Sequence, residues 1–212
     1  MRLTKTAATA AAILLAAAAS RSAAASAEDV ARQVEARLAR PSDLRARFVQ
    51  SYRSGMLGRE VKERGTLSLK RPGRMRWDYE SPEKKTFVSD GRAFYFYVPA
   101  DRQVLVREQK DATGVAGLLL AGQDRALEPF TPSLEAAPAG LLRLRLVPRK
   151  PDPEVEELRI DVDTAYRVRA IEVLDAQGNR SRFEFDDLRE NVGLKDELFR
   201  FQVPRGVEVI SG

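Results

Sequence analysis

The sequence of 212 residues contains neither cysteine nor histidine. This absence excludes disulfides, thiol nucleophiles, Cys/His zinc sites, cysteine-held iron–sulfur clusters and Ser-His-Asp triads. A hydrophobic run of the roughly 20 residues that a membrane-spanning helix needs is also missing. The chain does have 43% hydrophobic and 32% charged residues, a composition typical of a globular protein with a sizeable core.

The first 27 residues have the order of a secretory signal peptide, with a basic start, an apolar run and an exit of small residues, carried by Arg2 and Lys5, by Ala7–Ala19 and by Ala25-Ser26-Ala27. An uncleaved anchor is the alternative. Without residues 1–27, which hold three of the 36 basic residues and no acidic one, 33 basic residues face 31 acidic ones. We therefore predict an exported chain of residues 28–212, whose charge is weak evidence for nucleic-acid binding.

Most of this chain alternates apolar and polar residues with period two, which predicts about eleven strands joined by tight turns. The expected strands cover residues 43–52, 58–70, 74–79, 85–89, 93–98, 103–107, 141–147, 155–162, 166–174, 180–188 and 199–203. Residues 28–38 have the four-residue spacing of an amphipathic helix. A short apolar helix is expected within 111–122, and an irregular segment over 129–140. Sequential hairpins in one domain predict an antiparallel meander that curls, because a flat sheet would expose its edges.

Two further patterns were weighed for function. The carboxylate pairs Asp161/Asp163 and Glu184/Asp186 each share a strand face, as the carboxylates of a glycosidase would. The alternating arginines around them favour an outer face with cross-strand ion pairs instead. The basic and aromatic residues of 71–79 resemble a nucleic-acid face, but Asp78 interrupts them. Neither an enzyme nor a nucleic-acid partner is therefore predicted.

A curled sheet with an apolar inner face encloses either a packed core or a cavity. The aromatic run of residues 94–97 fits both interpretations. The apolar segment of residues 114–120 either plugs the mouth of a barrel or belongs to the core. Periodicity alone leaves both questions open.

Residues 65–77, Gly-Thr-Leu-Ser-Leu-Lys-Arg-Pro-Gly-Arg-Met-Arg-Trp, resemble the signature of the LolA family of periplasmic outer-membrane lipoprotein carriers. The hairpin motif of residues 88–91, the Tyr-Val-Pro of 97–99, the start of a lid helix at 110–114, and residues 48–50 and 199–207 also fit. The resemblance covers residues 28–210. It implies an incomplete, unclosed antiparallel β-barrel of about eleven strands with a short helical lid and an N-terminal helix, in agreement with the strand count.

The resemblance also implies a function. The chain would be a periplasmic carrier that shields the acyl chains of lipoproteins, takes them from an inner-membrane ABC-type releasing complex and passes them to an outer-membrane acceptor lipoprotein. A LolA-like carrier or sensor of another acylated molecule or lipid is the alternative. A monomer without cofactor, metal or catalytic residue is expected.

The functional residues implied by the resemblance form two groups. Arg71 would latch a lid built from Gly114, Leu118, Leu119 and Leu120. An acyl-chain cavity would be lined by Phe48, Met75, Trp77, Phe87, Phe94 and Phe96, with Met75 at the lip where many members have phenylalanine. Core packing is the alternative role of these aromatic side chains.

Overall fold

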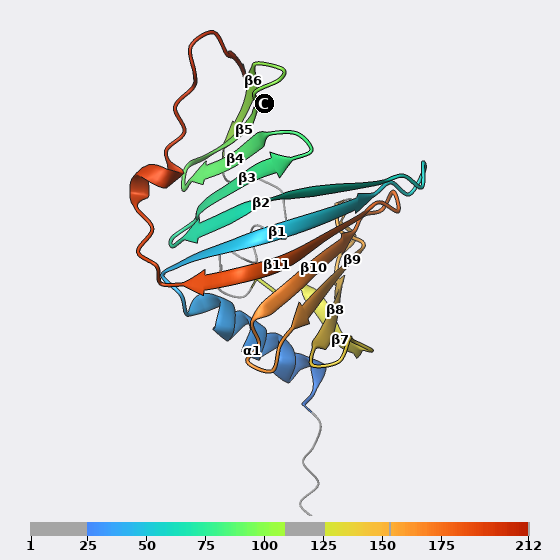
Figure 1. Cartoon of the computed structure of the whole chain (residues 1–212). Coiled ribbons are helices and arrows are strands. Elements are labelled where there is room, and N and C mark those ends of the chain that lie inside the picture. The colour runs from blue at the N-terminus through green and yellow to red at the C-terminus, as the bar shows by residue number, and fades with distance from the viewer. Residues whose placement is uncertain (1–24, 109–125, 153, 212) are drawn as a thin grey trace, which may run out of the picture.

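The computed structural model describes residues 25–108, 126–152 and 154–211. Within them, one curved sheet of 12 strands has the order β12-β6-β5-β4-β3-β2-β1-β11-β10-β9-β8-β7. Helix α1 (Ala27–Ala39) lies along one face of this sheet (Figure 1). We call that face the inner face and the opposite one the outer face. None of the described helices is long and apolar enough to cross a membrane.

The sheet consists of two antiparallel meanders. The first comprises β1 (Asp43–Arg53), β2 (Glu60–Lys70), β3 (Arg74–Ser81), β4 (Lys85–Asp90), β5 (Ala93–Val98) and β6 (Gln103–Glu108). The second comprises β7 (Phe130–Glu135), β8 (Leu142–Pro148), β9 (Glu157–Val162), β10 (Val168–Leu174) and β11 (Arg180–Glu190). Antiparallel pairing of β1 with β11 joins them. Because β7 and β12 stay at opposite edges, the sheet does not close, which confirms the predicted unclosed barrel.

The N-terminal helix is also confirmed. Ser26 caps it, because its hydroxyl oxygen accepts a hydrogen bond from the Asp29 amide while the Asp29 carboxylate accepts one from the Ser26 amide. Val30 and Val34 are fully buried and pack α1 into the main hydrophobic cluster. Arg37 then fixes the far end of α1, because its Nη2 donates to both carboxylate oxygens of Glu190 at 2.7 Å.

Two strand predictions were wrong. Residues 130–135, expected to be irregular, form β7, where Pro132 is tolerated because β7 is an edge strand that needs fewer donors. Residues 199–203, expected to be a strand, instead start at the last residue of the 3₁₀ helix η2 (Asp196–Phe199) and continue without a ladder. There Phe199 is buried and Phe201 stacks on Tyr95, so the apolar alternation reflects side-chain packing alone.

The last strand was not predicted either. β12 (Glu208–Ser211) pairs with β6 in parallel, the only parallel pairing among the described strands. Its four residues are too short for a periodicity signal. The helix expected within residues 111–122 lies outside the described residues.

Candidate functional site

The inner face of the first meander carries aromatic residues from several neighbouring strands. Strand pairing aligns one row across the sheet, formed by Ala46, Leu67, Trp77, Phe87 and Phe96. The adjacent row is formed by Leu44, Leu69, Met75, Ser89 and Phe94. The six residues proposed to line a cavity therefore share this inner face, because Phe48 begins a third row with Gly65 and Tyr79.

These side chains form a connected set of aromatic contacts. The Phe48 ring meets Trp77 edge-on at 4.8 Å and Tyr79 at 4.9 Å between centroids. At the open edge of the set, Phe87 and Phe96 stack at 4.2 Å. Such pairs prefer edge-on or offset arrangements, so each ring fixes the orientation of its neighbour.

Two aromatic members of the lining were missed at the level of sequence. Phe183 lies 5.2 Å from Trp77 and Phe185 lies 6.2 Å from it, both on β11. Their signal was the alternation of the strand predicted over 180–188. This alternation alone does not place them in the lining, because the pairing of β1 with β11, which brings them beside Phe48, joins segments from opposite ends of the chain.

Burial falls steadily across this face. Phe48 and Trp77 are 2% and 6% exposed, whereas Phe87, Phe94 and Phe96 are only half-buried. Met75, expected at a lip, is buried at 8% exposure between Leu69 and Ser89. The lining thus has a buried part, which we call the floor and which contains Phe48 and Trp77, and a side toward β5 where aromatic surface stays accessible.

Gly65 permits the tight floor. A Cβ at this position would lie 2.8 Å from the Phe48 ring and 2.0 Å from the carbonyl oxygen of Asp78. Both distances are shorter than real Cβ contacts, so the Phe48 ring packs directly over the glycine backbone.

A polar cluster borders the floor toward the β1–β2 turn. The Tyr79 hydroxyl donates to Gln50 Oε1 at 2.7 Å, and Gln50 Nε2 donates to Ser181 Oγ at 2.8 Å. Beside them, the Lys85 ammonium pairs with Glu63 at 2.6 Å and lies 4.4 Å from the centre of the Tyr79 ring. Burial, reinforced by the Glu63 charge, raises the pKa of Tyr79, so its hydroxyl remains a donor.

Arg71 lies in the turn between β2 and β3, at the opposite end of β2. Its Nε donates to the Pro41 carbonyl at 2.9 Å, and its guanidinium also donates to the Leu38 carbonyl. Arg71 therefore stabilises the C-terminal end of α1, whose last carbonyls lack partners within the helix. The expected lid residues Gly114, Leu118, Leu119 and Leu120 lie outside the described residues. A pocket here is lined by Arg71 together with Leu38, Leu44, Leu69, Tyr166 and Leu188 among others.

The carboxylates weighed for catalysis lie on the outer face or in turns. Asp161, 1% exposed, accepts hydrogen bonds from Arg143 at 2.6 Å and from Arg182 at 2.9 Å. Asp163 pairs with Arg167, and Glu184 with Arg182. The predicted cross-strand ion pairs are therefore present at Asp161, whereas Asp163 and Glu184 pair with arginines of their own segments. No group of three potential metal-ligating side chains occurs among the described residues.

Comparison with known proteins places these features in a family context. The family described as "Outer membrane lipoprotein carrier protein LolA" matches residues 41–202. A protein from Methylococcus capsulatus named "Outer-membrane lipoprotein carrier protein" is 32% identical over 170 residues, which cover 79% of this chain and 81% of that protein. A protein of the same name from Chromobacterium violaceum is 31% identical over 181 residues, or 85% and 86% of the two chains.

A solved structure shares the fold. The crystal structure of an uncharacterized conserved protein from Thermus thermophilus superposes with a TM-score of 0.56 at 13% sequence identity. The match covers 88% of this chain and 99% of that one. At this identity the likeness concerns the fold alone.

Proposed function

We propose a function from the premise that this chain belongs to the LolA family of outer-membrane lipoprotein carrier proteins. The chain is a carrier of lipoproteins and not an enzyme. It holds the acyl chains of its cargo against the aromatic inner face of the first meander. The main support for this proposal is the decrease in burial across the inner face. Phe48 and Trp77 are buried, whereas Phe87, Phe94 and Phe96 are half-buried.

This decrease in burial suits a reversible binding site for hydrocarbon. Each CH₂ group removed from water contributes about 0.8 kcal/mol, so acyl chains do not cross an aqueous compartment unshielded. A carrier also has to release its cargo. Rigid aromatic rings that are already half-buried gain only part of that energy on binding, which keeps the grip moderate.

The route of the cargo extends this proposal. Its source is an inner-membrane ABC-type releasing complex, and its destination is an acceptor lipoprotein in the outer membrane. The chain works in the periplasm as a monomer after removal of its signal peptide. Arg71 holds the closed state by binding backbone carbonyls, and the lid of residues 114–120 is its second set of partners beside Leu38 and Pro41.

The cap of α1 supports a signal peptide that ends two residues before the boundary predicted from the sequence. Cleavage after Ala27 would remove Ser26 and with it the capping box. Cleavage after Ala25 also follows an A-x-A sequence, Ala23 to Ala25, and leaves Ser26 as the first residue. Its new ammonium group then faces the Asp29 carboxylate. We therefore place the mature N-terminus at Ser26, which the intact mass of the exported chain tests.

Native mass spectrometry tests the carrier function. The exported chain is co-expressed with a tagged outer-membrane lipoprotein and with the same lipoprotein lacking its acylated cysteine. A one-to-one complex only with the acylated form is expected. A complex with both forms would contradict acyl-chain recognition. Bound phospholipid or another acylated molecule in place of the lipoprotein would favour the alternative cargo.

Arg71→Leu tests the latch in the same system. We expect the variant to stay folded, to bind cargo and to transfer it more slowly to an acceptor lipoprotein. Arg71→Lys is the matched control, because it keeps the charge and loses the planar fork that reaches two carbonyls. If Arg71→Leu unfolds, the residue serves α1 alone and the latch proposal is wrong.

A further inference from the structure

The turn between β1 and β2 exposes two large apolar side chains side by side. Met56 is 91% exposed and Leu57 is 68% exposed, the two highest values among the large hydrophobic residues of the described chain. Single exposed apolar residues are ordinary on protein surfaces. Two adjacent ones at the apex of a hairpin, where short polar turn residues are the usual choice, require a different explanation.

One more apolar pair of the inner face lies between the polar cluster and the apex. Tyr52 and Val61 are direct cross-strand partners, 38% and 46% exposed, on the same face as Phe48. They lie beyond Gln50 and Glu63, the next pair toward the floor. Tyr52 and Val61 are therefore separated from the Phe48 floor by the polar cluster and form the apolar base of the apex that carries Met56 and Leu57.

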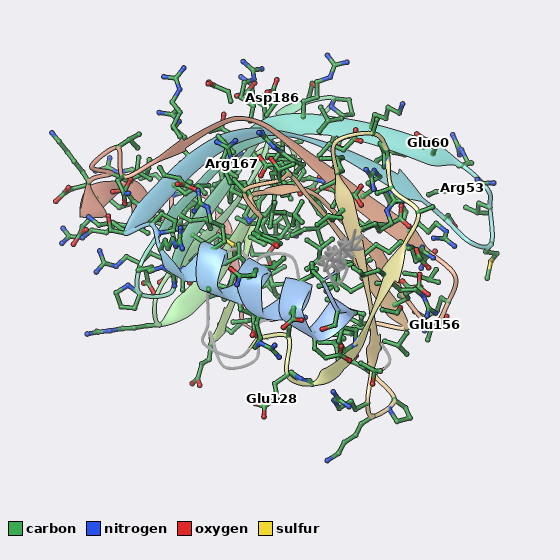
Figure 2. All side chains as sticks on the ribbon, turned by 90° about the horizontal axis from the view of Figure 1, so that it is seen from below. Arg53, Glu60, Glu128, Glu156, Arg167 and Asp186 are labelled. Atoms are coloured by element: carbon green, nitrogen blue, oxygen red, sulfur yellow. The ribbon has the colours of Figure 1, made fainter. Side chains whose placement is uncertain are left out.

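The flanks of the apex are basic. Residues 52–62 contain Arg53, Arg59 and Lys62 against a single acidic residue, Glu60, and Lys62 Nζ lies 3.5 Å from Glu60 Oε1, so Arg53 and Arg59 carry the excess charge. The neighbouring β10–β11 turn adds one residue of each sign, Asp175 and Arg180, and so leaves the excess unchanged. Figure 2 shows Arg53 and Glu60 together at one end of the molecule.

A second hairpin supports the apex from the side. The Gly55 amide donates to Asn179 Oδ1 at 3.0 Å, and a Cβ at Gly55 would lie 2.7 Å from the backbone of Gln177 and Gly178. The two turns are therefore in direct backbone contact, and they extend together beyond the neighbouring strand β3 (Figure 1). This support presents Met56 and Leu57 outward from a braced position.

We propose that this hairpin tip, residues 52–62, docks on the surface of a bilayer that contains anionic phospholipid. Met56 and Leu57 enter the boundary between headgroups and acyl chains, and Arg53 and Arg59 contact the phosphates. The proposal rests on the carrier function, because a docked tip holds the carrier at the bilayer from which acyl chains leave or which they enter. Binding to neither kind of vesicle would instead favour a protein partner, because methionine and arginine are also common at protein interfaces.

Vesicle flotation tests the proposal with the purified, cargo-free chain. Vesicles of phosphatidylethanolamine and phosphatidylglycerol are compared with vesicles of phosphatidylcholine alone, at low and high salt. We expect the chain to float with the anionic vesicles, and less so at high salt because exposed charges are screened. The double variant Met56→Ser/Leu57→Ser should weaken binding by about tenfold or more, since it removes most of the inserted apolar surface.

Two further variants separate the contributions. Arg53→Gln/Arg59→Gln should weaken binding to the anionic vesicles by roughly an order of magnitude and reduce the effect of salt. Val192→Ser is the matched control, because Val192 is 46% exposed but follows β11 at the opposite end of β1. It should bind like the unmodified chain.

The proposal fails if the unmodified chain floats with neither kind of vesicle, or if the Met56/Leu57 variant floats as well as the Val192 control. Complex formation with the acylated lipoprotein is measured in parallel. A tip variant that loses vesicle binding and keeps its cargo supports the proposal. Failure of the carrier function itself would instead appear as loss of the lipoprotein complex in the unmodified chain.

Discussion

The two meanders of the sheet use the same alternation for different purposes. In the second meander the inner face of β8 and β9 is aliphatic at its centre, where Leu144, Leu146, Leu158, Ile160 and Val162 are all at 0% exposure. In the first meander it is aromatic, and its outer members Phe87, Phe94 and Phe96 are only half-buried. The centre of the second meander is therefore a packed core, whereas the first meander keeps accessible aromatic surface beside its buried residues.

Different coverings explain the contrast. Helix α1 packs against β7 and β8, and its buried Val30 and Val34 complete the aliphatic core. The outer faces of the two meanders also differ in what covers them. Arginine–carboxylate pairs cross β7 to β11, as between Arg159 and Glu172 at 3.0 Å. The C-terminal segment packs on β3 to β5, where Phe201 stacks on Tyr95 at 5.3 Å. The most deeply buried core therefore lies in one half of the sheet, and the proposed cargo site lies in the other.

Ile160→Ala should have the largest effect on stability. Ile160 is fully buried, and removing a buried isoleucine side chain costs about 2–5 kcal/mol of unfolding free energy, because a cavity replaces it. Urea denaturation followed by circular dichroism measures the loss. If Ile160→Ala loses less than about 1 kcal/mol, the second meander is not the stable half and the contrast fails.

Asp161→Asn tests the outer face of the same half. Burial alone would raise the pKa of Asp161, but hydrogen bonds from Arg143 and Arg182 outweigh it and hold the pKa below its usual value. The ionised form therefore stabilises the fold above the unfolded pKa of about 4, and this contribution is lost as pH falls through the folded pKa. We expect a loss of about 2–3 kcal/mol at pH 7.

The pH dependence separates this electrostatic role from packing. The unmodified chain should lose stability steadily below about pH 5, and Asp161→Asn should show a shallower decline because its side chain does not titrate. Denaturant midpoints between about pH 3 and pH 7 measure both curves. Parallel curves would show that Asp161 contributes nothing through its charge.

Phe96→Ala should mainly reduce cargo affinity, whereas Ile160→Ala should mainly reduce stability. Phe96 is half-buried and stacks on Phe87, so its removal costs about 1 kcal/mol of stability. Cargo affinity should fall by roughly tenfold, because an accessible ring of the lining is lost. Native mass spectrometry with the acylated lipoprotein and urea denaturation provide the two readouts. Tyr95→Ala is the control, since Tyr95 faces the C-terminal segment on the outer side.

The sequence predicts the part of this contrast that is local. Period-two alternation located ten of the strands, and the four-residue apolar spacing of residues 28–38 located α1. The family signature in residues 65–77 pointed to Trp77 and the inner face. Long-range features had no such signal. The pairing of β1 with β11, which adds Phe183 and Phe185 to the lining, depends on strands at opposite ends of the chain. Strand β7 escaped because Pro132 is acceptable only at an edge, and edges are a property of the whole sheet.

Tyr79→Phe should have the smallest effect and sharpen the boundary of the aromatic half. The variant loses the hydrogen bond to Gln50, while Gln50 still donates to Ser181, so about 0.5–1.5 kcal/mol of stability is expected to disappear at pH 7. Tyr52→Phe, at a 38% exposed position on the same strand face as Gln50, should change stability by less than about 0.5 kcal/mol.

At alkaline pH the stability difference between Tyr79→Phe and the unmodified chain should become smaller. Because burial raises the pKa of Tyr79, the folded chain keeps this proton at a pH where the unfolded chain has released it. The stability contributed by the protonated hydroxyl is therefore complete below about pH 10 and is lost above it. Tyr79→Phe removes that loss, so its deficit relative to the unmodified chain should shrink between about pH 9 and pH 11. A deficit that stays constant would mean that the Tyr79 hydroxyl reaches water and that the polar cluster does not close the aromatic floor.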